Sequence, residues 1–363
     1  MIRPSPTVSL PVLAYHAVGP GERLDPARFV QHAQAIQNAG LPILASADLE
    51  RAERGALITL DDGFADLWTH GLSVLAAHDL RALVFVIPPR CGDGSPRPKG
   101  VCAWSGGQRR AHAEAARSGE AHPAFLRWSE LEALEASGRV EVQSHGQSHA
   151  MGWVDDEIIG FHLGSLGRTH WSLPQSTGGD ERLGIPLYRR GSTLAHRLYA
   201  DNKYLRDYLA RWLEERGGEA YVAERGAKAV SRELQVVVKV YRGRQRLAGT
   251  WESDAARVRR TVEDLVSARE TLERRLGGCR DQLALPWGQY DQVTLECARQ
   301  AGLRRVYTLD RAPNLAGRIG LLVHRFEPRP RGARWLRLRL WIYQSAWRAC
   351  LYGRLSGRMR GAV

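Results

Sequence analysis

The chain has 363 residues, a hydrophobic fraction of 44% and a formal net charge of +13. This composition excludes a disordered chain and allows one large domain or two ordinary ones around a sizeable core. The positive charge predicts an anionic partner, such as a phosphorylated substrate or a membrane surface. A nucleic-acid partner is not expected, because the arginines do not gather into dense basic blocks.

The N-terminus and the cysteines bear on the cellular compartment. Residues 1–18 hold one arginine, two early prolines and only a short apolar run, which is not typical of a signal peptide. The five cysteines include no C-x-x-C pair, which excludes a zinc ribbon and a disulfide framework and favours reduced thiols. No apolar run is long enough to span a bilayer. We therefore expect a cytoplasmic protein.

Strand-like and helix-like patterns alternate along the chain. In chain order, the sequence predicts a strand at 9–18, a helix at 26–40, a strand at 57–60, a helix at 64–79, a strand at 81–89, a helix at 128–138 and a strand at 140–145. A long amphipathic helix at 254–278 precedes a strand within 279–291, a helix at 292–302 and strands at 303–310 and 320–326. This alternation predicts parallel strands with helical crossovers, in an open sheet or a barrel.

Three segments fall outside this alternation. Residues 90–125 are rich in Gly, Pro and Arg and predict a long loop insertion. Residues 152–250 predict a second insertion with one or two added helices. Its segment 162–216 is expected either to shape the substrate cleft or to form a dimer contact. Residues 329–363 form a basic tail that contains tryptophans. The oligomeric state does not follow from the sequence.

Candidate functional residues follow the predicted strands. Asp61 and Asp62 follow the run ALITL, and His145 and His149 stand at the end of the strand VEVQ. In parallel α/β folds, functional residues gather at the carboxyl ends of strands, so these groups are expected to share one rim.

The residue types suit a metal site. Two imidazoles at i and i+4 can face one point if that turn is helical, and one carboxylate with two histidines forms a facial triad with open positions. Adjacent side chains at a strand end point in opposite directions, so Asp61 and Asp62 are expected to have different roles. One can bind the metal while the other approaches the metal-bound water. Each piece has a plainer interpretation: Asp-Asp-Gly suits a turn or helix cap, and the two histidines can be unrelated. The combination after successive strands favours the metal site.

The sequence resembles the polysaccharide deacetylases (carbohydrate esterase family 4, the NodB homology domain). That family's motif T-F-D-D-G corresponds to residues 59–63, TLDDG, and H-[S/T]-x-[S/T]-H corresponds to 145–149, HGQSH. The motif R-x-P-[Y/F/W]-G corresponds to 284–288, ALPWG, and L-x-x-H to 321–324, LLVH. LAYHAV near the N-terminus resembles the first strand of many members.

The resemblance implies a distorted (β/α)7 barrel that hydrolyses an N-acetyl group from a sugar. It covers residues 9–150 and 252–327, so we expect a catalytic domain at 9–328 that carries both insertions, followed by the tail. By carry-over, Asp61 is the general base, the Trp287 N–H helps to hold the oxyanion, and His324 is the general acid. A divalent metal, usually zinc in such enzymes, would be bound by Asp62, His145 and His149.

Two positions depart from the family pattern. The arginine of the third motif, which orients the catalytic aspartate, is Ala284 here, and we predict that Arg325 replaces it in contact with Asp61. Gly146 replaces a Ser or Thr, for which little harm is expected. His324 can also be a surface histidine beside a structural arginine. His16 either lines the rim or is a core histidine.

The tail interleaves tryptophans with arginines over residues 334–358. It is either a helix packed on the barrel or an interfacial helix on anionic lipid, and the second would give a peripheral inner-membrane protein acting on a lipid-linked saccharide.

Two function classes follow from these features. The first is a metal-dependent deacetylase acting on an N-acetylated saccharide. The second is a non-catalytic sugar-binding relative or an accessory protein of glycan biosynthesis or export, for which Ala284 would mark lost activity. The complete set of two aspartates and two histidines favours the enzyme.

Overall fold

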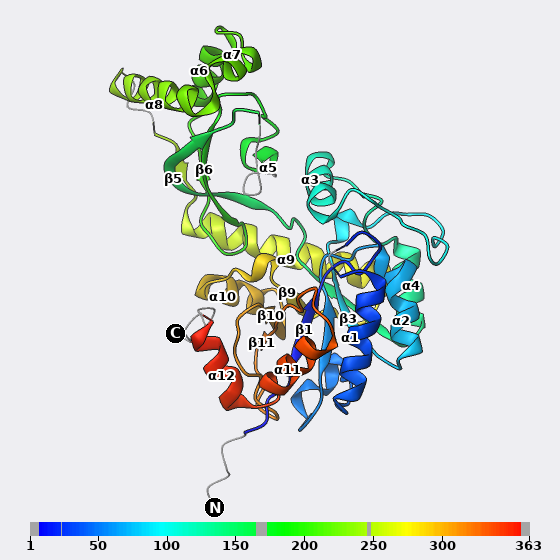
Figure 1. Cartoon of the computed structure of the whole chain (residues 1–363). Helices are drawn as coiled ribbons and strands as arrows, with labels where there is room; N and C mark the ends of the chain where they lie inside the picture. The colour runs from blue at the N-terminus through cyan, green and yellow to red at the C-terminus, as the bar shows by residue number, and fades with distance from the viewer. Residues whose placement is uncertain (1–6, 23, 165–172, 245–247, 357–363) are drawn as a thin grey trace, which may run out of the picture.

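The computed structural model describes residues 7–22, 24–164, 173–244 and 248–356. Parts of the second insertion (165–172, 245–247) and of the tail (357–363) lie outside the described residues. Figure 1 shows a barrel from which the second insertion projects on one side. Within the described residues, no helix is both long and apolar enough to cross a bilayer.

Seven parallel strands form the central sheet, as predicted. Their order along the sheet is that of the chain: β1 (Val12–Tyr15), β2 (Leu57–Leu60), β3 (Ala82–Val86), β4 (Val140–Ser144), β9 (Gln282–Ala284), β10 (Arg305–Thr308) and β11 (Leu322–His324). Beyond β11, Phe326 pairs with Leu13 of β1, and its backbone N–H donates to the Val12 carbonyl at 3.0 Å. This bridge brings the last strand beside the first, so the sheet is nearly closed into a distorted (β/α)7 barrel.

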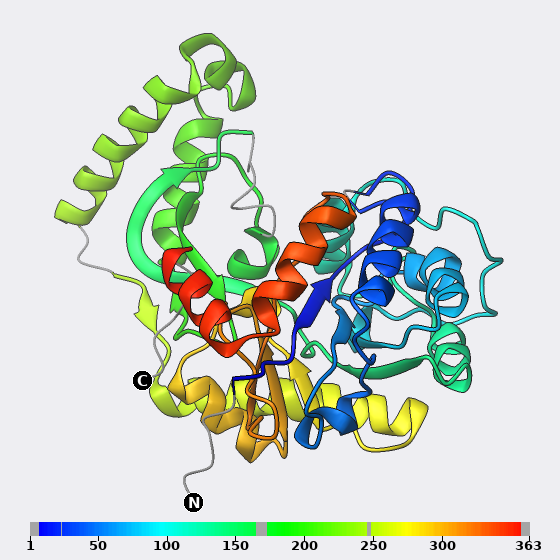
Figure 2. The same ribbon diagram turned by 60° about the horizontal axis from the view of Figure 1, so that its bottom comes forward.

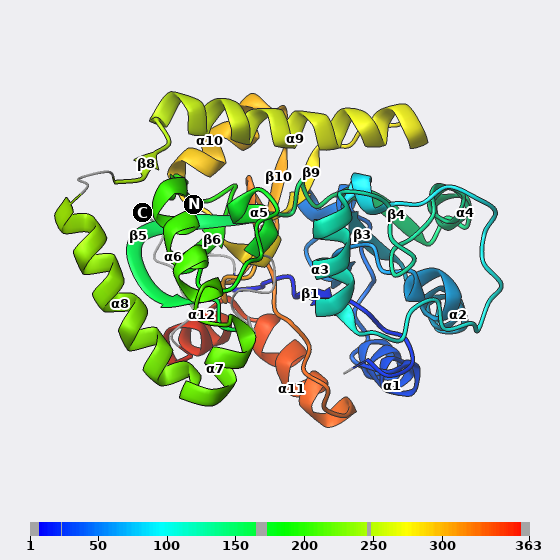
Figure 3. The ribbon, with the colours of Figure 1, turned by 90° about the horizontal axis from the view of Figure 1, so that it is seen from above.

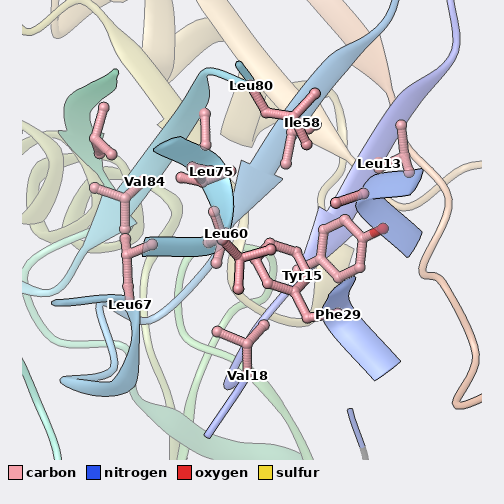
Figure 4. Packing of buried hydrophobic residues seen from close by; sticks show 14 of the residues in the cluster. Leu13, Tyr15, Val18, Phe29, Ile58, Leu60, Leu67, Leu75, Leu80 and Val84 are labelled. Atoms are coloured by element: carbon pink, nitrogen blue, oxygen red, sulfur yellow. The ribbon is translucent and has the colours of Figure 1, made fainter. Parts of the chain in front are cut away.

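Strand residues alternate between the inside and the outside of the barrel. Val12, Leu57 and Phe85 belong to an inner cluster that also holds Ala284, Tyr307 and Val323 from the opposite strands. Their neighbours Leu13, Ile58 and Val84 point outward against the helices, as Figure 4 shows for β1, β2 and β3. Because both faces are apolar, the strands appear in the sequence as continuous hydrophobic runs.

The surrounding helices follow the expected order. They are α1 (Pro26–Asn38), α2 (Leu72–Ala77), α4 (Trp128–Ala136), α9 (Asp254–Leu276) and α10 (Gln292–Gln300). Asp25 caps α1 through a 2.7 Å bond from the Arg28 N–H, and Ser253 caps α9. In the view from above, α9 runs along one edge of the molecule and leads from the second insertion back to the barrel (Figure 3).

Both insertions hold more regular structure than the sequence predicted. The first contains α3 (Gln108–Ser118), which lies between Gly107 and Gly119, both with positive φ. The second was predicted as one or two helices, but it begins with a curved antiparallel pair of strands, β5 (Met151–Phe161) and β6 (Pro186–Ser192) (Figure 2). Its other elements are α5 (Leu173–Thr177), β7 (Tyr199–Ala200), α6 (Lys203–Glu214), α7 (Glu219–Arg225), α8 (Ala227–Arg244) and β8 (Thr250–Trp251).

The tail forms two helices, α11 (Ala333–Tyr343) and α12 (Ala346–Leu355). Leu336, Leu340 and Tyr343 are buried in the outer core, and α11 packs against α1. The rings of Tyr343 and Phe326 stack with centroids 4.5 Å apart, which ties α11 to the strand that closes the barrel. The exposed side of the tail carries Trp341 and Trp347.

Candidate active site and metal centre

The two adjacent aspartates point to different partners because their backbones differ. Asp61 continues the alternation of β2 and faces the barrel interior, where it is 3% exposed. Asp62 has φ +72°, a left-handed conformation that Asp tolerates better than most residues. This backbone turn separates the two carboxylates. Gly63 follows with φ +73°, and a Cβ there would lie 2.8 Å from Val86 Cγ1, so the turn requires glycine.

Arg325 holds Asp61, as predicted. Its Nη1 donates to Asp61 Oδ1 at 2.6 Å and its Nη2 donates to Asp61 Oδ2 at 2.9 Å. Nη1 also donates to Thr59 Oγ1 at 3.0 Å, and the guanidinium is fully buried. Burial opposes ionisation of Asp61, but the Arg325 charge and the nearby histidines together lower the pKa of this carboxyl. Asp61 is therefore an oriented carboxylate.

Three side chains converge beside this pair. The ligand atoms of Asp62, His145 and His149 lie within 4.8 Å of one another, and all three residues are buried. Asp62 Oδ1 is 3.4 Å from His145 Nε2 and 3.3 Å from His149 Nε2. The structure therefore brings together the three residues that the sequence analysis selected as metal ligands.

The protonation of these groups fits a cation. His145 Nδ1 donates to the Ala284 carbonyl at 2.8 Å, which leaves Nε2 free to act as a ligand. Burial lowers the pKa of His149 well below its usual value, so its ring is neutral. Burial opposes ionisation of Asp62, but the contact with His112 outweighs it, and the pKa of Asp62 lies well below its usual range. Asp62 Oδ1 is buried and has no hydrogen-bond partner among the described residues.

The loop that carries both histidines is not helical, yet it still brings their rings to one point. Asp264 of α9 accepts the Gln147 N–H at 2.8 Å and the Ser148 N–H at 3.0 Å, so its carboxylate fixes the loop. Gly146 has φ +81°, and a Cβ there would lie 3.2 Å from Asp264 Oδ1. This conformation explains why glycine stands where the family pattern has Ser or Thr.

Two residues of the site were missed by the sequence analysis. His112 of α3 is buried, its Nε2 lies 3.2 Å from Asp62 Oδ2, and its ring stacks on His149 with centroids 5.0 Å apart. Arg90 contacts His112 Nδ1. Because a guanidinium only donates, Nδ1 is the acceptor and Nε2 carries the proton that bonds to Asp62. Arg90 and His112 therefore orient this carboxylate.

The other predicted residues lie in different settings. Trp287 has φ +55°, and its ring lies 4.3 Å from the His149 ring, between centroids. His324 Nδ1 lies 3.1 Å from Thr308 Oγ1, and the alternation of β11 directs its side chain outward, between the inward Val323 and Arg325. No described contact joins His324 to the aspartates. His16, which follows β1, lies close enough for its charge to lower the pKa of both Asp61 and His112.

Comparisons with known proteins support the motif resemblance. Residues 48–159 match the family model described as polysaccharide deacetylase. The fold is similar to a de-N-acetylase from Aggregatibacter actinomycetemcomitans (TM-score 0.55, 15% identity, 91% of this chain and 99% of that one). It is also similar to IcaB from Ammonifex degensii (TM-score 0.52, 17% identity, 92% of this chain and 97% of that one). A third similar structure is the BpsB deacetylase domain from Bordetella bronchiseptica (TM-score 0.53, 16% identity, 90% of this chain and 97% of that one).

No curated protein sequence matches the chain. At these identities the solved structures establish the barrel fold. The family model matches residues 48–159, and this match together with the motifs supports the resemblance of the chain to the polysaccharide deacetylases.

Proposed function

We propose that this chain is a metal-dependent hydrolase that removes an N-acetyl group from an amino sugar in a glycan or a lipid-linked saccharide. The observation that carries the proposal is the pairing of two carboxylates with different surroundings. Asp62 meets two histidine nitrogens, while Asp61 is held ionised by Arg325. A deacetylase needs both, because an amide is a poor electrophile and neutral water is a poor nucleophile.

The three converging side chains suit a divalent cation, and we propose Zn²⁺. One carboxylate and two neutral imidazoles are a common zinc donor set that leaves positions open. When bound, such an ion lowers the pKa of water from about 15.7 towards about 7 and polarises a carbonyl oxygen. Asp62, His145 and His149 would hold it, and His112 would keep Asp62 oriented through the bond to its other oxygen.

The chain's own residues then divide the proton transfers. Asp61 accepts a proton from the attacking water, because it is ionised and Arg325 fixes both of its oxygens. The Trp287 N–H would donate to the acyl oxygen as it gains charge. A second group must deliver a proton to the departing amine nitrogen. We favour His16 over His324 for that step, because His16 acts electrostatically on Asp61 whereas His324 bonds to Thr308 on the outer side of β11.

The alternative function is a non-catalytic sugar-binding relative or an accessory protein of glycan export. Ala284 is the ground for that alternative, since the arginine of the third motif is absent. The Arg325–Asp61 pair weakens it, because a guanidinium reaches the same carboxylate from a different strand.

Acetate release from a panel of N-acetylated saccharides and lipid-linked glycans tests the proposal. We expect turnover that chelation abolishes and Zn²⁺ restores, and a loss of at least 100-fold in Asp61→Asn. Asp93→Asn is the matched control, because the Asp93 side chain is 79% exposed and contacts none of the candidate site residues. No turnover on any member of the panel by a protein that binds zinc stoichiometrically would favour the alternative.

We further propose that residues 334–358 contact an anionic membrane from the cytoplasmic side. The supporting observation is that Trp341 and Trp347 are 55% and 72% exposed, while Trp335 packs on the core. Each Arg near an anionic leaflet contributes about 1 kcal/mol, so the contact would be reversible and sensitive to salt.

Point variants test the membrane contact better than truncation, because α11 supplies part of the core. Trp341→Ser with Trp347→Ser is expected to leave the chain in the supernatant when it is sedimented with anionic vesicles at low salt. Trp251→Ser, which removes an exposed tryptophan of the second insertion, is the control. Equal sedimentation of all three proteins would contradict the proposal.

A further inference from the structure

A cavity of about 450 Å³ lies between the barrel mouth and the tail helices. Its inner end is formed by His16 and Arg325, and Arg325 holds Asp61. Its outer wall comes from α11, α12 and the segments that follow β10 and β11. The cavity therefore begins beside the proposed catalytic carboxylate and extends under the tail.

Three arginines of this wall give the cavity its charge. Arg311 follows β10, Arg329 follows β11, and Arg339 stands on α11. None of the three forms an ion pair with a carboxylate among the described residues, and Glu327 is the single acidic residue of the described lining. Arg325 adds no net charge, because Asp61 neutralises it. The lining thus has an excess of positive charge facing the site.

The aromatic residues position two of these arginines. The Arg311 Cζ lies 5.4 Å from the centroid of the Tyr352 ring, and the Arg339 Cζ lies 4.4 Å from it. Because both guanidinium groups contact the same Tyr352 ring, their Cζ atoms are within about 10 Å of each other. A contact with a ring holds a guanidinium in place but leaves its charge and its N–H donors available for a ligand.

A further group in the lining lacks a partner. Tyr343 is 3% exposed, and its hydroxyl is buried without a hydrogen-bond partner among the described residues. A buried hydroxyl is normally satisfied, so an acceptor in the cavity would remove a cost of about 1–3 kcal/mol. Guanidinium groups supply donors only, and the phenol hydroxyl can add another donor, which is the chemistry that binds phosphate oxygens.

We infer that this cavity binds a phosphoryl group of the saccharide whose N-acetyl group lies at Asp61. This inference rests on the proposed function and adds the substrate class, a phosphorylated N-acetylated saccharide. The phosphate has two possible sources, a soluble sugar phosphate or a lipid-linked saccharide. The position of the cavity beneath α11 and α12 suits both, and the charge chemistry is the same.

Binding of inorganic pyrophosphate, measured by calorimetry at low salt, tests the site without turnover. Arg311→Gln and Arg339→Gln are each expected to weaken binding about tenfold or more, since each removes charge-assisted bonds to the phosphate oxygens. Arg337→Gln is the matched control, because it stands exposed on the same helix and does not line the cavity. Failure of the native chain to bind pyrophosphate, or equal binding by all variants, overturns the inference.

Turnover separates this inference from the proposed function. We expect kcat/KM for an N-acetylhexosamine 1-phosphate to exceed that for its neutral methyl glycoside about tenfold or more, with the preference lost in Arg339→Gln and kept in Arg337→Gln. Hydrolysis of both substrates at equal rates would leave the deacetylase standing and refute the phosphate subsite. Pyrophosphate binding that depends on Arg311 and Arg339, without any turnover, would support the subsite and refute the proposed activity.

Two more substrates identify the source and the kind of anion. A polyprenyl-linked saccharide in vesicles that is preferred over the soluble sugar phosphate supports the phosphate site and assigns it to a lipid headgroup. The reverse preference supports it and assigns it to a free sugar phosphate. An equal gain with a uronate-bearing disaccharide would show that any anion suffices, which overturns the assignment to phosphate.

Discussion

Replacing Arg325 with methionine tests whether this arginine keeps Asp61 ionised inside the barrel. Methionine has a similar reach but no charge and no donors. The arginine is fully buried and Asp61 is 3% exposed, and two bonds of 2.6 and 2.9 Å join them. The Arg325 guanidinium lies against the rings of Phe85 and Tyr307, so methionine would fit this apolar surface but would leave the buried Asp61 carboxylate without its main partner.

Removal of one partner from a buried ion pair destabilises a protein by about 3–5 kcal/mol, and we expect a loss in that range at pH 7.5. The loss of stability in Arg325→Met should also depend on pH. In the native chain the pKa of Asp61 is lowered, so its contribution to stability is present above the unfolded value, about 3.9, and is lost at lower pH. In Arg325→Met, burial without the guanidinium raises this pKa above the unfolded value. The variant then binds a proton in the folded state, and its deficit shrinks as the pH falls from about 7 to about 5.

Urea unfolding at pH 7.5 and pH 5.0 measures both effects. The double variant Asp61→Asn with Arg325→Met removes the uncompensated charge and is expected to recover about 2 kcal/mol or more of the loss. Arg337→Met, at an exposed position of α11, is expected to change the free energy of unfolding by less than about 0.5 kcal/mol. The reasoning fails if Arg325→Met is as stable as the native chain at pH 7.5, or if the second substitution recovers nothing.

Three further predictions concern the metal centre and its loop. Asp61→Asn is expected to keep bound zinc and lose activity, whereas Asp62→Asn loses the zinc; equal metal loss in both, by mass spectrometry, would contradict the division of roles. His112→Phe removes the bond to Asp62 and is expected to weaken zinc affinity about 10–100-fold in a chelator competition, while the remote His78→Phe leaves it unchanged. Gly146→Ala places a Cβ at φ +81° and is expected to cost about 1–2 kcal/mol in urea unfolding; an unchanged midpoint would show that the loop tolerates side chains.

Much of the fold could be predicted because parallel strands and their helices leave strong local patterns. Each strand is buried on both faces, so β3 reads as the continuous apolar run ALVFV. The pairing of β5 with β6 left no such pattern. The centre of β5, VDDE, is polar, and the partner strand lies about 25 residues away. The α3 segment was taken as loop because its Gly- and Arg-rich surroundings outweighed the alanines at positions 111, 113, 115 and 116.

The grouping of the candidate metal ligands could be predicted because Asp62, His145 and His149 lie within five residues of the ends of β2 and β4, where the fold brings them together. Arg90 and His112 could not, since the second comes from an inserted helix whose position over the site depends on tertiary packing. The general-acid role of His324 stays a prediction, and its placement could not be predicted from the motif. Whether a residue at a strand end faces inward depends on its register, and on β11 the inward positions belong to Val323 and Arg325.

The arginine at position 325 and the alanine at position 284 are parts of one arrangement. Ala284 faces the barrel interior together with Tyr307 and Val323, and its strand, β9, lies two strands away from Arg325. A seven-stranded barrel is narrow, so a long side chain from either strand can reach the carboxylate after β2. Arginines at both position 284 and position 325 would leave one guanidinium buried without a carboxylate. A small residue at position 284 therefore fits with arginine at position 325. Position 284 still contributes to the site through its backbone. The Ala284 carbonyl accepts a hydrogen bond from His145 Nδ1, and this bond does not depend on the side chain at position 284. We therefore interpret the missing motif arginine as a relocated contact, in which Arg325 bonds to both oxygens of Asp61.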